Sequence, residues 1–247
     1  MKIGIYIPGA VDQFNAETGL KMVRLLETLG LECYYPDGLT DCGMEFFMQG
    51  DRETARLLGE KMMELYEDCN YIVSCGSASV TYMKCNFHCL FHNTTFHNNY
   101  RQFVDKLYDV CDFLINEMHY IPNHVSFPHR VAFMDHCTTS RDYVSSTYPE
   151  RKGLTEEPRQ LLKAVEGIEL VEMSENDMCC GFGGLFANNF TPISDNLAKR
   201  KVERAIAAGA EYIVSTETSC MLHLRSYAEK TAMNIKFAHV LDVICDL

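Results

Sequence analysis

An internal repeat constrains the fold of this chain of 247 residues more than any other feature. Tyr71-Ile72-Val73-Ser74 returns as Tyr212-Ile213-Val214-Ser215. Two further pairs keep the same order and similar intervals: Asp41-Cys42-Gly43 with Cys179-Cys180-Gly181, and Gly9 with Cys137. The repeat length of roughly 130–140 residues fits a duplicated domain rather than a solenoid unit. We predict two homologous halves, residues 1–125 and 126–247, joined near Ile121-Pro122-Asn123.

Short apolar runs typical of β-strands alternate with amphipathic segments of helical period. Strands are expected at Lys2–Ile7, Leu31–Tyr35, Tyr71–Ser74, Arg130–Met134, Ile168–Glu172, Glu211–Ser215 and Ile235–Ala238. Helices are expected at Ala16–Leu29, Pro158–Glu166 and Asn196–Ala208, the last with Ser194 as its N-cap. The alternation predicts an α/β fold made of two Rossmann-like α/β halves with mostly parallel sheets.

Composition excludes several classes of function. The chain has 22 Lys and Arg against 34 Asp and Glu, a formal charge of −12, which argues against a nucleic-acid partner. Its apolar runs are far shorter than the roughly 20 residues that span a bilayer. Because Met1–Gly9 is typical of a buried strand and turn rather than a signal peptide, we expect a cytoplasmic protein. Its 12 Cys are then expected to stay reduced.

Four of these cysteines follow or adjoin predicted strand ends in the second half: Cys137, Cys179, Cys180 and Cys220. In an open parallel sheet such ends lie on one side, where ligands bind, so the four thiols are expected to meet there together with His223. Thiolates hold iron–sulfur clusters, and Cys with His holds zinc. Spacing alone leaves this interpretation and plain burial of the thiols equally open, because the intervals match no compact metal-binding pattern.

The segments around these cysteines resemble those of a known family, the cysteine-rich "CCG" domain proteins. They are His136-Cys137, Asp177-Met178-Cys179-Cys180-Gly181-Phe182-Gly183-Gly184, Lys199-Arg200-Lys201 and Ser219-Cys220-Met221-Leu222-His223. The family includes the cysteine-rich subunit of heterodisulfide reductase, the glycolate oxidase iron–sulfur subunit and the lactate-utilisation protein A branch, which the chain resembles most in length and duplicated layout.

The resemblance implies that Cys137, Cys179, Cys180 and Cys220 bind an iron–sulfur cluster, with His223 as a further candidate ligand. Zinc is the alternative metal, because some relatives hold zinc in one CCG motif. In the first half Gly9, Asp41 and either Ala78 or Ser79 replace three of the cysteines, leaving Cys42 with Cys75 nearby. We therefore expect one metal centre, in the second half.

The function that the resemblance implies is an iron–sulfur electron-transfer subunit of an NAD-independent L-lactate, or related 2-hydroxy acid, oxidation complex. Its direct partners would be the other subunits of that complex. The hydroxy acid would be an indirect partner, reached through those subunits. Alternatives are a zinc-stabilised interaction subunit and a thiol–disulfide redox protein similar to heterodisulfide reductase. No catalytic residue is predicted.

Three further groups of residues have both a functional and a structural interpretation. Cys85, His88, Cys89, His92 and His97 form a second candidate metal site, for which we favour packing and solvation. Asp135 and His136 are an acid–base pair, a clamp on the centre or simple turn residues. Arg141 and Lys201 have three interpretations: they attract an anionic substrate, they offset thiolate charge, or they form exposed salt bridges, which is the commoner role of such residues.

Overall fold

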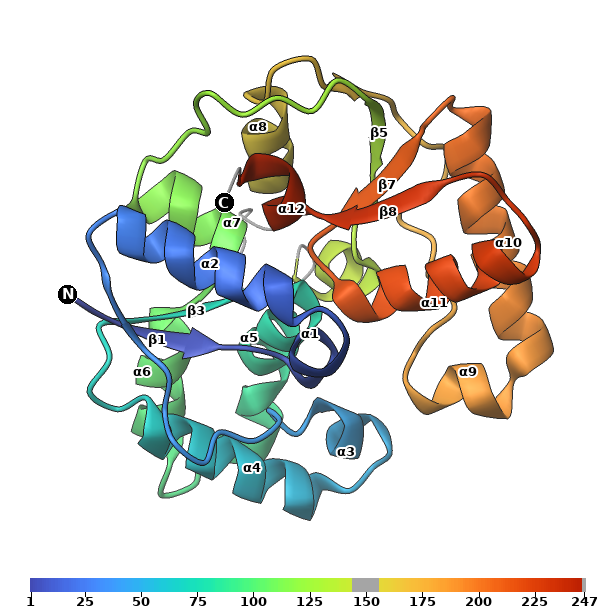
Figure 1. The fold of residues 1–247 in the computed structure, drawn as a ribbon. Helices are drawn as coiled ribbons and strands as arrows, with labels where there is room; N and C mark the ends of the chain where they lie inside the picture. The colour runs from blue at the N-terminus through green and yellow to red at the C-terminus, as the bar shows by residue number, and fades with distance from the viewer. Residues whose placement is uncertain (144–155, 246–247) are drawn as a thin grey trace.

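Each half of the chain forms one four-stranded parallel sheet in the computed structural model, which describes residues 1–143 and 156–245 (Figure 1). The first sheet has the order β2 (Glu32–Tyr34), β1 (Lys2–Tyr6), β3 (Tyr71–Ser74), β4 (Leu107–Asp109). The second has the order β6 (Glu169–Leu170), β5 (Arg130–Phe133), β7 (Tyr212–Ser215), β8 (Lys236–His239). All pairings within both sheets are parallel, which confirms the predicted α/β fold with two similar halves.

Helices flank both sheets. In the first half they are α1 (Gly9–Phe14), α2 (Ala16–Thr28), α3 (Met44–Met48), α4 (Arg52–Leu65), α5 (Ser77–Phe91), α6 (His97–Lys106), α7 (Val110–Asp112) and η1 (Phe113–Glu117). In the second half they are η2 (Thr139–Tyr143), α8 (Glu157–Lys163), α9 (Leu185–Asn189), α10 (Thr191–Ala207), α11 (Thr218–Lys230) and α12 (Val240–Ile244). Within the described ranges, no helix is long and apolar enough to cross a membrane.

The strand register fixes the correspondence between the halves. Tyr6 pairs with Ser74 in the first sheet. In the second, Phe133 pairs with Val214, so that Met134 and Ser215 are the corresponding residues at the strand ends. Gly9 therefore corresponds to Cys137, as the sequence repeat predicts, and Ser79 rather than Ala78 corresponds to Cys220.

Two local expectations differ from the structure. The sequence does not predict strand β4, because its three residues form no apolar run. Helix α10 begins at Thr191, with Pro192 in its first turn, so Ser194 lies inside the helix and the prediction that it is the N-cap is wrong. Pro is favoured in the first turn because its missing N–H has no partner to lose there. Inside the helix, the Ser194 hydroxyl contacts the neighbouring loop.

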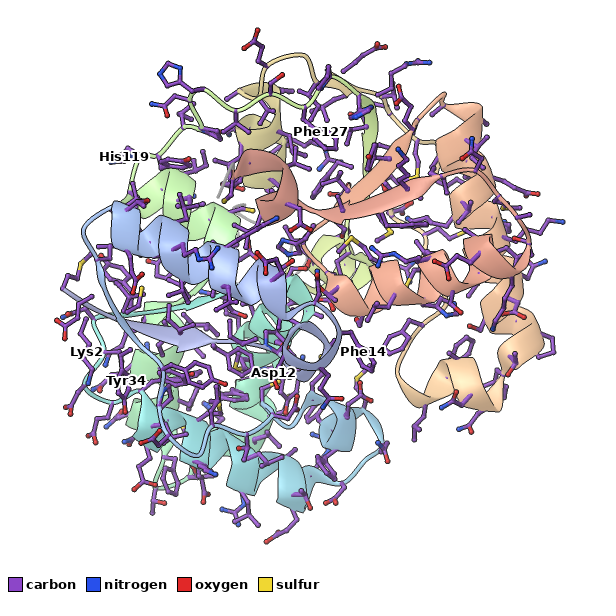
Figure 2. All side chains as sticks on the ribbon, in the orientation of Figure 1. Lys2, Asp12, Phe14, Tyr34, His119 and Phe127 are labelled. Atoms are coloured by element: carbon purple, nitrogen blue, oxygen red, sulfur yellow. The ribbon has the colours of Figure 1, made fainter. Side chains whose placement is uncertain are left out.

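One apolar core is shared by the two halves. It combines residues of both sheets, among them Ile5, Val73, Val131 and Val214, with α2 and α12. Helix α12 packs against α2, and α7 packs against α8, so each half contributes a helix to the other's surface. The connection between the halves runs along the outside of the molecule, past His119 and Phe127 (Figures 1 and 2). The boundary near residue 125 stays a prediction.

The carboxyl ends of the two sheets face each other. Helix α5 packs on η2, and α1 packs on α11. Glu217, only 5% exposed, lies between the amino ends of α5 and α11. Its Oε1 accepts from Ser219 N at 3.2 Å, and its Oε2 accepts from Ala78 N at 3.0 Å. One carboxylate thus caps two helices that belong to different halves.

Replacing Glu217 by Ala should lower the free energy of unfolding by about 2–4 kcal/mol, because it leaves buried N–H groups of two helices unsatisfied. Glu217→Gln, which keeps one carbonyl oxygen, should fall between Glu217→Ala and the wild type. Urea unfolding measures this, with the exposed Glu203→Ala as control. A Glu217→Ala protein as stable as the control would contradict the bridging role.

A second buried carboxylate gives stability a pH dependence. Asp109 Oδ1 accepts from Cys111 N at 2.9 Å, whereas its Oδ2 has no hydrogen-bond partner. Burial, reinforced by Asp112 and Glu157, raises the pKa of Asp109 to about 7. The folded protein therefore keeps a proton that the unfolded chain releases near pH 4, and stability falls as the pH rises from about 4 to 7.

In Asp109→Asn this loss of stability with rising pH should disappear. Between pH 5 and pH 8 the wild type should lose about 2–3 kcal/mol more stability than the variant. Urea unfolding at the two pH values gives the comparison. Equal losses in both proteins would show that Asp109 does not carry the effect.

Candidate functional site

The four cysteines of the second half converge, and they form a continuous series of contacts. Cys137 hydrogen-bonds to Cys179, and Cys179 to its neighbour Cys180. The Cys180 and Cys220 sulfurs lie 2.8 Å apart. Cys220 in turn contacts the imidazole of His136. The residues come from the segment between β5 and η2, the loop before α9 and the first turn of α11, which meet at the carboxyl edge of the second sheet.

The contacts separate the thiols into two ionisation classes. Hydrogen bonds from Cys137 and Cys180 lower the pKa of Cys179. A hydrogen bond from Cys180 lowers the pKa of Cys220 to about 7, against the opposing effect of burial. The same bonds, together with burial, raise the pKa values of the donors Cys137 and Cys180. Sulfurs whose ionised form is favoured, Cys179 and Cys220, therefore alternate along the series with sulfurs whose protonated form is favoured, Cys137 and Cys180.

His136 is part of this site. Burial lowers its pKa, but the Cys220 thiolate and further negative groups outweigh burial and raise it to about 9. Thr138 Oγ1 lies 2.8 Å from His136 Nδ1 and fixes the ring. The sequence offers His136, together with Asp135 and beside Cys137, as an acid–base residue, a clamp on the centre or a turn residue. Its contact with Cys220 favours a place beside the thiols.

Asp135 itself belongs to the scaffold. Arg159 of α8 donates to both of its carboxylate oxygens, at 2.7 and 2.6 Å, and Asn176 Nδ2 donates to Oδ2 at 2.8 Å. A carboxylate held by a bidentate guanidinium is fixed in position and orientation. The structure therefore favours the clamp interpretation for Asp135, in which it holds the loop that leads to Cys179.

The Cys179–Cys180 loop is seated by backbone geometry. Gly181 N donates to Cys179 Sγ at 3.3 Å, and Phe182 N donates to Cys180 Sγ at 3.5 Å. Gly181 has φ +94°, and a Cβ there would lie 2.5 Å from Ser194 O. Only glycine fits this close, left-handed approach to α10.

His223 lies behind the loop rather than in the series of thiol contacts. Its Nε2 is 3.1 Å from Ser194 Oγ, which also donates to Gly181 O at 2.7 Å. Burial lowers the pKa of His223, so the ring is neutral at physiological pH. The structure thus places His223 next to the cysteine loop. Its role as a ligand, like the roles of the four cysteines, stays a prediction.

In the first half the corresponding site is filled by a phenol. Tyr6 replaces Met134, and its hydroxyl accepts from Cys42 N at 3.2 Å and contacts Ser79. Asp41 takes the place of Cys179 in the same turn, because its Oδ1 accepts from Gly43 N at 2.8 Å. The loop is therefore retained by a carboxylate while the space beside Cys42 is occupied by the Tyr6 ring.

The remaining first-half candidates do not join Cys42. Cys75 lies in the shared central core, while Cys42 lies in the outer core of its half. On α5, Cys89 Sγ is 3.3 Å from His88 Nε2 at the exposed surface. Beyond the end of that helix, the rings of His92 and of His97, the first residue of α6, are 5.1 Å apart. These contacts fit the packing and solvation that the sequence favours.

The second-half residues fit a thiophilic metal by their donor chemistry. In residues 1–143 and 156–245, no group of three or more His, Cys, Asp or Glu side chains has the spacing needed to hold a metal ion. Zn–S bonds of about 2.3 Å in a tetrahedron place two sulfurs about 3.8 Å apart, so Cys180 and Cys220 would have to separate by about 1 Å. Four thiols beside two backbone N–H donors otherwise supply what a cluster or zinc requires.

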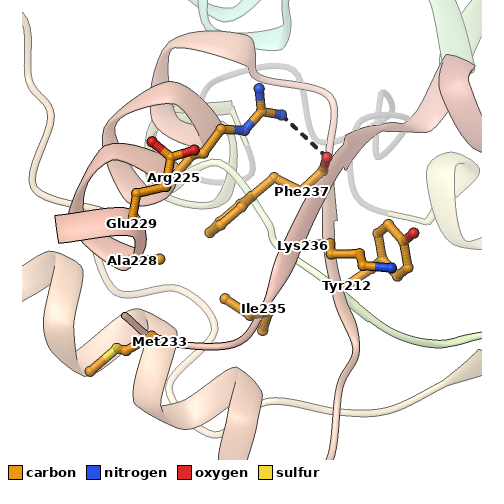
Figure 3. A pocket seen from close by; sticks show the side chains of 8 residues that line it. All are labelled: Tyr212, Arg225, Ala228, Glu229, Met233, Ile235, Lys236 and Phe237. Carbon is orange, nitrogen blue, oxygen red and sulfur yellow. Dashed lines mark hydrogen bonds between the residues drawn. The ribbon is translucent and has the colours of Figure 1, made fainter. Parts of the chain in front are cut away.

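An open cavity of about 410 Å³ lies elsewhere, between α11 and the edge strand β8 (Figure 3). Arg225 crosses it and donates to Phe237 O at 3.2 Å, and Lys236 lies over the Tyr212 ring. No cysteine lines this cavity, so it is separate from the thiol site.

Comparisons with known proteins agree with the fold. Lactate utilization protein A 1 of Bacillus cereus (strain AH820) is 28% identical over 244 residues, covering 99% of this chain and 98% of the relative. Lactate utilization protein A of Bacillus thuringiensis (strain Al Hakam) matches to the same extent.

Among solved structures, a hypothetical protein from Helicobacter pylori matches with a TM-score of 0.67 at 9% identity. The match covers 98% of this chain and 48% of that one, and it supports the fold alone. The profile of the cysteine-rich (CCG) domain matches residues 5–80 and 131–225, one stretch in each half. The second stretch contains all four converging cysteines. The chain therefore belongs to the cysteine-rich CCG domain family.

Proposed function

We propose that this protein is an iron–sulfur electron-transfer subunit of an NAD-independent system that oxidises L-lactate or a related 2-hydroxy acid. The observation that carries the proposal is the convergence of Cys137, Cys179, Cys180 and Cys220 in a chain that matches proteins named lactate utilization protein A along its length. We further propose that it works in the cytoplasm with separate partner subunits.

Oxidation of a 2-hydroxy acid to the 2-oxo acid releases two electrons and two protons. When bound, an iron–sulfur cluster accepts and passes on single electrons. The protein's own contribution is to hold the thiolates, to donate Gly181 N–H and Phe182 N–H to their sulfurs, and to keep His136 beside Cys220. Partner subunits would bind the hydroxy acid and the final electron acceptor.

Two alternatives use the same residues. Zinc would make the centre structural, because it has no redox chemistry, and the four thiols would serve it equally well. A thiol–disulfide function is favoured by the 2.8 Å separation of the Cys180 and Cys220 sulfurs. It is opposed by the loss of most first-half cysteines, on which the fuller heterodisulfide reductase pattern depends.

Metal analysis of protein purified without oxygen distinguishes these functions. We expect about four iron and four sulfide per chain, absent in Cys180→Ser because a thiolate ligand is lost. The internal repeat supplies the matched control: Cys42→Ser, at the corresponding position, should keep the full content. About one zinc without sulfide would favour the structural alternative, and an unchanged iron content in Cys180→Ser would contradict the assigned ligands.

A genetic experiment tests the role in lactate use. Cells that lack this gene should not grow on L-lactate, and either the wild type or Cys42→Ser should restore growth. Cys180→Ser should fail while accumulating to the same level, as measured by immunoblot. Full restoration by Cys180→Ser would refute the electron-transfer role.

A further inference from the structure

Lys201 is a buried cation beside the thiol site. It lies on the apolar stripe of α10, with Ala198, Val202 and Ala205, and is 1% exposed. Its Nζ donates to the carbonyl oxygens of Asn176 at 2.5 Å and Met178 at 2.8 Å. Within the described ranges, no carboxylate lies within ion-pairing distance of it. A buried ammonium without a carboxylate partner is costly unless other negative charge compensates it.

The groups near Lys201 that carry negative charge when ionised are cysteine sulfurs and one carboxylate. Burial lowers the pKa of Lys201, and Cys180, Cys220, Asp135 and Cys137, in that order, oppose this effect. The Asp135 carboxylate is already occupied by Arg159. The charge that remains to balance Lys201 is therefore the charge of the cysteine sulfurs.

The internal repeat links this cation to the thiols. Gly181 and Gly43 occupy corresponding positions, and each packs closely against a helix. A Cβ at Gly181 would meet Ser194 and Leu197 of α10, and a Cβ at Gly43 would meet Ala55 and Leu58 of α4, so these two pairs of helix residues correspond.

Continued along the two helices, this correspondence makes Met62 of α4 the equivalent of Lys201 of α10. Met62 is fully buried. The half in which Gly9, Asp41 and Ser79 replace three cysteines thus has an uncharged residue of similar length in place of the lysine.

We propose that Lys201 is the countercharge of the thiol site. Its ammonium anchors the backbone at Asn176 and Met178, which leads into the Cys179–Cys180 pair, and its charge stabilises the ionised sulfurs of the metal-bound state. Metals bind the thiolate form of cysteine, so each protonated sulfur must release its proton to solvent on binding, and a nearby cation favours that release. Lys201 acts through the cysteines and is a positioning residue. The inference rests on the proposed metal centre but holds for iron–sulfur and zinc alike.

The test is a Co²⁺ titration of the reduced, metal-free full chain without oxygen, followed by thiolate-to-metal charge-transfer absorption at pH 7 and pH 9. Lys201→Met introduces the residue of the first half, and Lys201→Gln keeps a donor without the charge. Lys199→Met, on the exposed face of the same helix, is the control. We expect both Lys201 variants to bind Co²⁺ about 10–100-fold more weakly at pH 7, as is usual when a group supporting metal ligands is removed. The difference in Co²⁺ affinity between the wild type and the variants should narrow at pH 9, where thiols ionise more readily even without a nearby cation.

Each other outcome has a definite meaning. If Lys201→Met binds Co²⁺ as tightly as the wild type, the countercharge role is overturned. The same holds if only Lys201→Gln does so, because that variant keeps a donor without the charge. An equal loss at both pH values would indicate a structural defect instead. Urea unfolding verifies that the variants are folded, and Lys201→Gln carries the test if Lys201→Met is not. A wild type that binds neither Co²⁺ nor iron would refute the metal centre and this inference with it, whereas binding unaffected by Lys201 would refute only this inference.

Discussion

The arrangement of the two halves depends on one buried carboxylate. Glu217 follows the end of β7 and caps both α11 and α5, so the carboxyl edges of the two sheets are held face to face. Helix amino ends carry partial positive charge, and two of them directed at each other would repel. The carboxylate between them removes that repulsion and satisfies N–H groups on both sides. The cysteine site lies at this junction because Cys220 occupies the first turn of the helix that Glu217 caps.

The two halves show which parts of a thiol site are needed for folding and which are not. The turn that presents Cys179 persists around Asp41, because a carboxylate accepts the same backbone N–H as a thiolate does. The left-handed glycine persists as Gly43 and Gly181. What differs is the interior of the site, where the Tyr6 hydroxyl contacts Cys42 and Ser79. The loop conformation is therefore retained by backbone requirements, independently of the ligand chemistry.

Much of this organisation follows from sequence. Apolar runs bounded by turns predict seven of the eight strands within the described residues, and placement at or near predicted strand ends predicts that Cys137, Cys179, Cys180 and Cys220 lie together. Strand β4 escapes prediction because three residues carry no periodic signal. The burial of Lys201 escapes it because a charged side chain favours an exposed salt bridge, although the spacing from Ala198 and Ala205 fits the apolar stripe. The contact between His136 and Cys220 depends on side-chain packing that spacing does not specify.

The shared core also has a consequence for how the chain reaches its native state. Thr18 and Lys21 of α2 contact Asp242 of α12, more than 200 positions later in the chain. Contacts of such sequence separation are slow to form, because a long loop must close before any burial rewards it. During synthesis, the apolar side of α2 must wait until residues near 240 have left the ribosome. Until then the first half has an incompletely covered core, and it is at this stage that the nascent protein most needs protection from aggregation.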